Sequence, residues 1–160
     1  MFAKNSGIDV QISDGAHWPV NAAQTALKYM RVLHIVFLFT IAFYVWIPFQ
    51  VAPKRHLESP LVIVVALALW SLAIVGLILF FYARRVAPAE ERLRSHPDDK
   101  SAAEIWKGGL TLCIVCCESI VVFGFALRML GVAWKISAPF YAVGALLLLA
   151  CRPKLELLPE

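Results

Sequence analysis

Apolar residues gather in four runs along the chain, and polar stretches separate these runs. The runs cover about residues 32–52, 60–83, 108–128 and 136–151. A helix needs about 20 apolar residues to cross the hydrocarbon core of a bilayer, so the first three runs are long enough and the fourth is short. The pattern therefore predicts an all-α fold, a four-helix transmembrane bundle.

The polar segments divide the chain around a single membrane domain. We expect residues 1–20 to form a polar N-terminal segment, residues 21–152 the membrane domain and residues 153–160 a C-terminal tail. The one long polar stretch inside the domain, residues 84–107, is predicted to be a loop. This loop should contain a short charged helix that begins at Pro88 and a turn from Ser95 to Asp98.

Residues that commonly begin or end helices mark the predicted boundaries. Ser101 and Glu104 have the spacing of a capping box, so the third helix should run from about Ala102 to Leu130, with Gly131 ending it. The other expected helix starts are Asn21, Ser59 with Pro60, and Ser137 with Pro139.

The composition agrees with a membrane location. Of the 160 residues, 61% are hydrophobic, and the formal net charge is +4. The basic residues stand just beyond the apolar runs and form no nucleic-acid-binding motif. We therefore expect the lipid bilayer as the partner, with anionic headgroups at the basic loop of residues 84–107, and no nucleic acid.

The distribution of basic residues predicts the orientation. Only four of the 15 Lys and Arg residues flank the first and third connections, namely Lys54, Arg55, Arg128 and Lys135. The other eleven lie on the side of the two termini and of the 84–107 loop. By the positive-inside rule, both termini are cytoplasmic. We expect an integral protein of a bacterial inner membrane.

One carboxylate, Glu118, stands in the middle of the third run, about 16 Å along the helix from Lys107. A charged group at the centre of a membrane helix costs roughly 2.5 to 3.5 kcal/mol, so such acids are protonated, paired or functional. Glu118 is thus the candidate proton-binding residue. Hydroxyl groups predicted at a similar depth are its candidate partners: Thr40, Tyr44, Ser71 and Ser119.

Small residues recur at three- and four-residue spacings in the third run and predict a close-packing face. They are Gly109, Cys113, Cys116, Cys117 and Gly124. The three cysteines also suggest half of a metal site, but no second pair of ligands accompanies them. His34 is a weak candidate ligand for a haem or a pigment. We predict no cofactor, and no enzyme activity, because no nucleophile, acid pair, phosphate loop or metal set is present.

The two halves of the sequence resemble each other at a shift of 79 residues. Lys28 falls on Lys107 and Pro60 on Pro139, and several apolar positions also match. The shift predicts a duplicated helical hairpin. Phe39 occupies the position of Glu118 in the first half, so only one hairpin would carry an acid.

The segment from Glu118 to Gly124, ESIVVFG, resembles the ion-binding helix of the rotor proteolipids of rotary ATPases. Those helices carry a mid-membrane acid followed by a small residue, an aliphatic residue and an aromatic-glycine pair. The resemblance implies that Glu118 binds a transported proton or sodium ion within a homo-oligomer. Proteolipids also have a glycine-rich helix, whereas the second run here contains only Gly76.

Three functions follow from these observations. In the first, the chain is a subunit of a larger membrane complex, and Glu118 takes part in proton transfer. In the second, it is a non-catalytic assembly subunit that uses its cysteine-glycine face and basic loop, with Glu118 only a packing group. In the third, His34 helps to hold a haem or a pigment. The first two imply a homo-oligomer or other membrane subunits as partners.

The orientation can be tested by labelling single introduced cysteines from outside the cell. A membrane-impermeant maleimide should label the Lys54→Cys variant and leave the Asp99→Cys variant unlabelled until the membrane is permeabilised. The reverse pattern would contradict the predicted topology.

Overall fold

The computed structural model describes residues 22–51 and 61–153, and regular structure in these ranges is entirely helical. Four long helices form a bundle, which confirms the predicted fold class. A π-helical turn, η1, and a short helix, α3, follow the second long helix. The elements are α1 (Ala22–Gln50), α2 (Leu61–Phe81), η1 (Tyr82–Val86), α3 (Ala87–Ser95), α4 (Lys100–Met129) and α5 (Trp134–Ala150).

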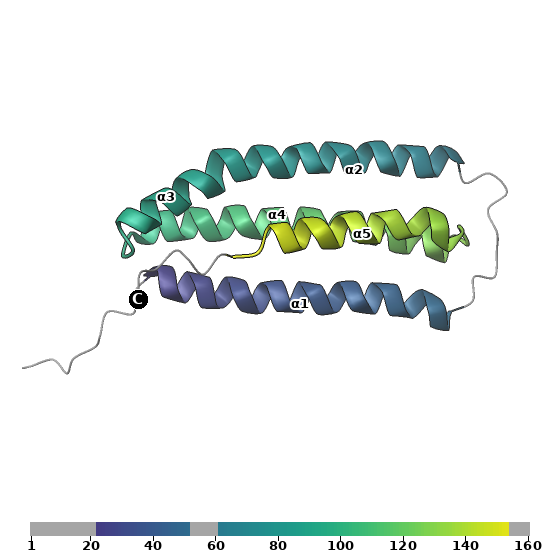
Figure 1. The fold of residues 1–160 in the computed structure, drawn as a ribbon, viewed down its shortest axis with the longest axis horizontal. Coiled ribbons are helices and arrows are strands. Elements are labelled where there is room, and N and C mark those ends of the chain that lie inside the picture. The colour runs from purple at the N-terminus through teal and green to yellow at the C-terminus, as the bar shows by residue number, and fades with distance from the viewer. Residues whose placement is uncertain (1–21, 52–60, 154–160) are drawn as a thin grey trace, which may run out of the picture.

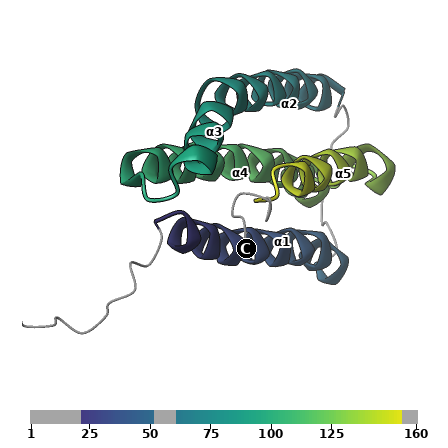
Figure 2. The same cartoon turned by 60° about the vertical axis from the view of Figure 1, so that its left-hand side comes forward.

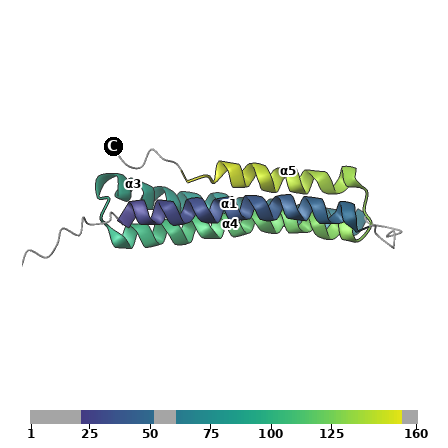
Figure 3. The ribbon, with the colours of Figure 1, turned by 90° about the horizontal axis from the view of Figure 1, so that it is seen from below.

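Helix α4 lies at the centre of the bundle and packs against all the others. Helices α1 and α2 lie on opposite sides of α4 (Figures 1 and 2). Helix α5 packs on a further side of α4, so it lies alongside α1 and α4, on one side of both, when the bundle is seen from below (Figure 3). The remaining side of α4 carries the exposed apolar side chains of Leu112, Val115 and Val122.

The outer surface of the bundle is apolar along most of its length. Three helical segments are long and apolar enough to cross a membrane: Ala23–Gln50, Leu61–Ser95 and Lys100–Met129. Helix α5 is also apolar but has 17 residues, as its short run predicted. Large apolar side chains of α2, such as Leu69, Trp70 and Leu79, are exposed. These are the features of an integral, multi-pass membrane protein.

The polar segment after α2 is mostly helical. The chain continues from α2 through η1 into α3 without a break, and α3 bends toward the start of α4 (Figure 1). Val86, Ala89 and Leu93 are buried in this contact, so the segment is a packed part of the bundle. The short charged helix and the turn before α4 are as predicted, and only residues 96–99 of the connection lie outside helices.

Two predicted helix starts are wrong. Helix α4 begins at Lys100 because Asp99 is its N-cap: the backbone of Asp99 is extended, and its carboxylate accepts a hydrogen bond of 3.1 Å from the Ala102 amide. The Ser101–Glu104 pair lies inside the helix. Asn21, Ser59 and Pro60, the other expected start signals in the first half, lie outside the described residues.

Helix α5 begins at Trp134, three residues before Ser137. Gly131, with φ of 83°, ends α4 as predicted and reverses the chain at once, so few residues are needed before α5 starts. The hydroxyl of Ser137 donates to the carbonyl of Trp134 at 3.3 Å and therefore does not cap the helix.

The two halves of the proposed repeat agree in where their first helices begin and end, but their helices pack differently. Shifted by 79 residues, α1 covers nearly the same positions as α4. However, α4 and α5 pack directly against each other, whereas α4 separates α1 from α2 (Figure 1). The two hairpins are therefore arranged differently.

Glycines allow α4 to approach its neighbours closely. A Cβ atom at Gly144 of α5 would overlap Val121 Cγ2 and lie 3.0 Å from the carbonyl oxygen of Cys117. A Cβ atom at Gly124 would lie 3.1 Å from that of Phe140, and one at Gly109 would lie 2.9 Å from Val86 Cγ2. The predicted close-packing face therefore meets both α5 and η1.

The α4–α5 contact can be tested with matched glycine substitutions. Alanine is normally more favourable than glycine in a helix, by about 1 kcal/mol. Gly144→Ala should instead lower the stability of the protein in detergent by about 1 to 3 kcal/mol, because the methyl group overpacks the contact. Gly76→Ala, with nothing within 4 Å of the new atom, is the control and should not destabilise. Equal melting temperatures of the two variants would contradict the contact.

Candidate functional site

Glu118 lies near the middle of α4 and is half-buried. It lines a depression of about 210 Å³ together with Val115, Ser119, Val122 and Phe123. All five residues belong to α4, so the depression opens onto the outer surface of this helix. The carboxyl group thus borders the exposed side of α4 and is not enclosed by the bundle.

The hydroxyl groups expected to bind Glu118 are engaged elsewhere. Those of Thr40, Ser71 and Ser119 donate to the backbone carbonyl four residues earlier in their own helices, at 3.0, 2.8 and 3.0 Å. This is the usual partner of a hydroxyl within an apolar helix. Of the three, only Ser119 lies in the depression beside Glu118.

The fourth candidate, Tyr44, belongs to the contact of α1 with α4 and α5. Its ring packs against Phe125 with centroids 5.2 Å apart, and its carbonyl accepts a hydrogen bond of 3.4 Å from the hydroxyl of Tyr141. Neither contact involves Glu118.

Within the described part of the chain, Glu118 therefore has no hydrogen bond or ion pair. The one ion pair found there joins Arg94 to Glu90 within α3 and does not involve Glu118. A carboxyl group at this depth has a high free-energy cost unless it is neutral, hydrated or bonded to another molecule. The geometry leaves Glu118 available for a partner outside the single chain.

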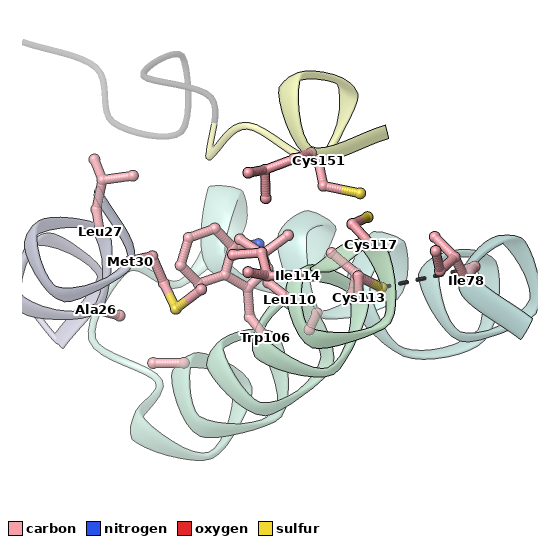
Figure 4. Packing of buried hydrophobic residues seen from close by; sticks show 14 of the residues in the cluster. Ala26, Leu27, Met30, Ile78, Trp106, Leu110, Cys113, Ile114, Cys117 and Cys151 are labelled. Carbon is pink, nitrogen blue, oxygen red and sulfur yellow. Dashed lines mark hydrogen bonds between the residues drawn. The ribbon is translucent and has the colours of Figure 1, made fainter. Parts of the chain in front are cut away.

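The small residues of α4 are used for packing inside the bundle. Gly109, Cys113, Cys117 and Gly124 are buried, and Cys116 is partly buried. Cys113 and Cys117 face Cys151 at the end of α5, and the thiol of Cys113 lies 3.9 Å from the carbonyl oxygen of Ile78 (Figure 4). The sequence pattern did not connect Cys151 with these thiols, although the antiparallel return of α5 along α4 brings it beside them.

No group of three or more His, Cys, Asp or Glu side chains among the described residues is arranged to hold a metal ion. The three thiols are instead part of an apolar core that also contains Met30, Trp106 and Ile114 (Figure 4). Their place in this core supports the packing interpretation.

His34 is brought together with two arginines that sequence reasoning did not connect with it. It is buried in α1 and lines a cavity of about 380 Å³ with Arg31 and Arg152. The return of the fourth span to the side where the first begins is the signal that places Arg152 there. A third cavity, of about 350 Å³, contains Arg84, Arg85 and Arg92 of the predicted headgroup-binding segment.

Comparison of the chain with protein-family models, with curated proteins and with solved structures finds no match.

The outward position of Glu118 can be tested with dicyclohexylcarbodiimide, which modifies protonated carboxyl groups in apolar surroundings. The reagent should modify Glu118 of the protein in detergent, and mass spectrometry of peptides should locate the adduct. Glu118→Gln should lose this adduct, whereas Glu104→Gln, which changes an exposed acid at the polar end of α4, should keep it. Modification only at acids outside the apolar part of α4 would contradict the outward position of Glu118.

Proposed function

We propose that this chain is a subunit of a larger membrane complex in which Glu118 binds and releases a proton. The observation that carries the proposal is the position of this carboxyl group near the middle of α4, bordering an outward-facing depression. A proton carrier needs a titratable group that a second surface or water can reach. Glu118 meets this requirement.

The environment of Glu118 differs from that expected of an acid that only fixes packing. Such an acid would be enclosed in the bundle and bonded to a hydroxyl or a carbonyl of a neighbouring helix. Glu118 has no such partner among the described residues, and Ser119 beside it bonds to Val115 of the same helix. The proton-transfer role thus accounts for the polar group better than the packing role does.

The neighbouring subunit would contact the side of α4 that carries Leu112, Val115 and Val122. These side chains are exposed and flank the depression. In the segment that resembles rotor proteolipids, Gly124 packs against Phe140 of the same chain. A neighbour would therefore approach α4 through aliphatic side chains and not through a glycine face.

The alternative assembly role relied on the cysteine-glycine face as a docking surface. That face is occupied by α5 and η1 within the chain, so it is not available to another subunit. A purely structural subunit would have to use a different surface.

The proposal predicts a specific loss on substitution. Glu118→Gln keeps the size and hydrogen bonding of the side chain but cannot titrate, and it should reduce proton-coupled activity of the complex roughly a hundredfold or more. Ser119→Ala, which removes a hydroxyl from the same depression, is the matched control and should retain activity. Proton uptake is measured by quenching of a pH-sensitive dye in inverted vesicles from cells that express each variant.

Assembly is measured in the same membranes by affinity purification and native gel electrophoresis. Wild-type activity in the assembled Glu118→Gln complex would refute proton transfer. If this variant fails to assemble, Glu118 has a structural role in the contact between subunits, and the loss of activity is no evidence for proton transfer.

A further inference from the structure

A second polar pocket lies where the end of α5 meets the first half of α1, nine residues or more after α1 begins. Its polar lining consists of Arg31, His34 and Arg152, and its apolar lining includes Ile35, Leu38 and Leu149. The cavity measures about 380 Å³. This pocket is separate from the depression at Glu118 and has no part in the proposed proton transfer.

The charged side chains that the structure describes around the pocket are all basic. Among the residues that the structure describes, its lining has two guanidinium groups and no carboxylate. Within the described part of the chain, neither Arg31 nor Arg152 forms an ion pair. Arginine is the residue best suited to binding phosphate, because its planar group donates two parallel hydrogen bonds.

His34 provides an independent sign that a ligand is missing. Its side chain is 6% exposed, yet its Nδ1 atom has no hydrogen-bond partner among the described residues. A buried polar atom without a partner is unfavourable and calls for an explanation, such as a ligand. An acceptor oxygen held between the arginines would supply this partner to the imidazole ring.

The apolar lining extends from this cationic end toward the membrane interior. Leu38 is seven residues, about 10 Å, further along α1 than Arg31. Leu149 faces the same cavity from α5. A ligand that fills the pocket therefore combines an anionic group with an adjoining hydrocarbon part.

We infer that this pocket binds the phosphate group of an anionic phospholipid. The phosphate is held by Arg31, Arg152 and His34 at the level of the headgroups, and an acyl chain lies along Ile35, Leu38 and Leu149. Free phosphate shares the anionic chemistry but would leave the apolar lining uncovered.

The test uses the purified full-length protein in detergent. Native mass spectrometry should detect one tightly retained phosphatidylglycerol per chain, and this lipid should raise the melting temperature, whereas phosphatidylcholine and inorganic phosphate should not. The double variant Arg31→Gln/Arg152→Gln should bind phosphatidylglycerol about tenfold more weakly, or worse, because two charge-assisted contacts are lost.

A matched control removes the same charge from a different arginine-lined cavity of the chain. Arg84→Gln/Arg92→Gln alters the other arginine-lined cavity and should leave the tight binding unchanged. Equal losses in the two double variants would indicate a diffuse basic surface and overturn the site. Saturable binding of inorganic phosphate that Arg31→Gln/Arg152→Gln abolishes would overturn the lipid assignment.

His34→Leu separates ligand binding from folding. This variant removes the unpartnered polar atom, so without lipid it should melt no lower than the wild type. It should nevertheless lose most of the rise in melting temperature caused by phosphatidylglycerol. An unchanged rise in this variant would show that His34 does not contact the ligand.

Discussion

The rest of the structure depends on the close approach of α4 and α5 at Gly144 and Gly124. The missing side chains let the backbones of the two helices come together, and the left-handed backbone of Gly131 turns the chain directly into this contact. The approach sets the rotation of α4 about its own axis. Once Cys117 and Val121 face α5, the neighbouring Glu118 is turned toward the exposed side of the helix.

The same contact determines what happens at the end of α5. Because α5 follows α4 back along the bundle, Cys151 meets the buried thiols of Cys113 and Cys117 (Figure 4). The next residue, Arg152, then reaches the cavity beside His34 of α1. One packing contact therefore positions both polar features of the membrane domain, although they lie at different depths.

The sequence predicted the helices well because their signals are local. Charge-free runs, the turn before α4 and Gly131 each act over a few residues, and they gave the four helices and the end of α4. The capping box failed because Asp99 offers a competing N-cap two residues earlier, and both caps have acceptable sequences. The start of α5 was misplaced because the tight turn at Gly131 needs no further polar cap.

The sites were harder to predict because depth in a membrane gives the position along a helix but not the direction of a side chain. Thr40, Tyr44 and Ser71 were placed near the depth of Glu118, yet the hydroxyls of Thr40 and Ser71 bond within their own helices. The small-residue face of α4 does indicate the direction in which Glu118 points. Glu118 follows Cys117 by one residue, about 100° around the helix, so burial of Cys117 against α5 turns the acid away from that contact.

The claim that Glu118 opens outward and carries protons is tested most directly by hydrogen exchange of its carboxyl group. Infrared difference spectra between wild type and Glu118→Gln in native membranes isolate the carbonyl band of this one group. If Glu118 opens outward and carries protons, the band should shift promptly in heavy water and its amplitude should change with pH. A carboxyl band that neither exchanges nor responds to pH would mean that Glu118 is sealed within the protein, and it would contradict the account.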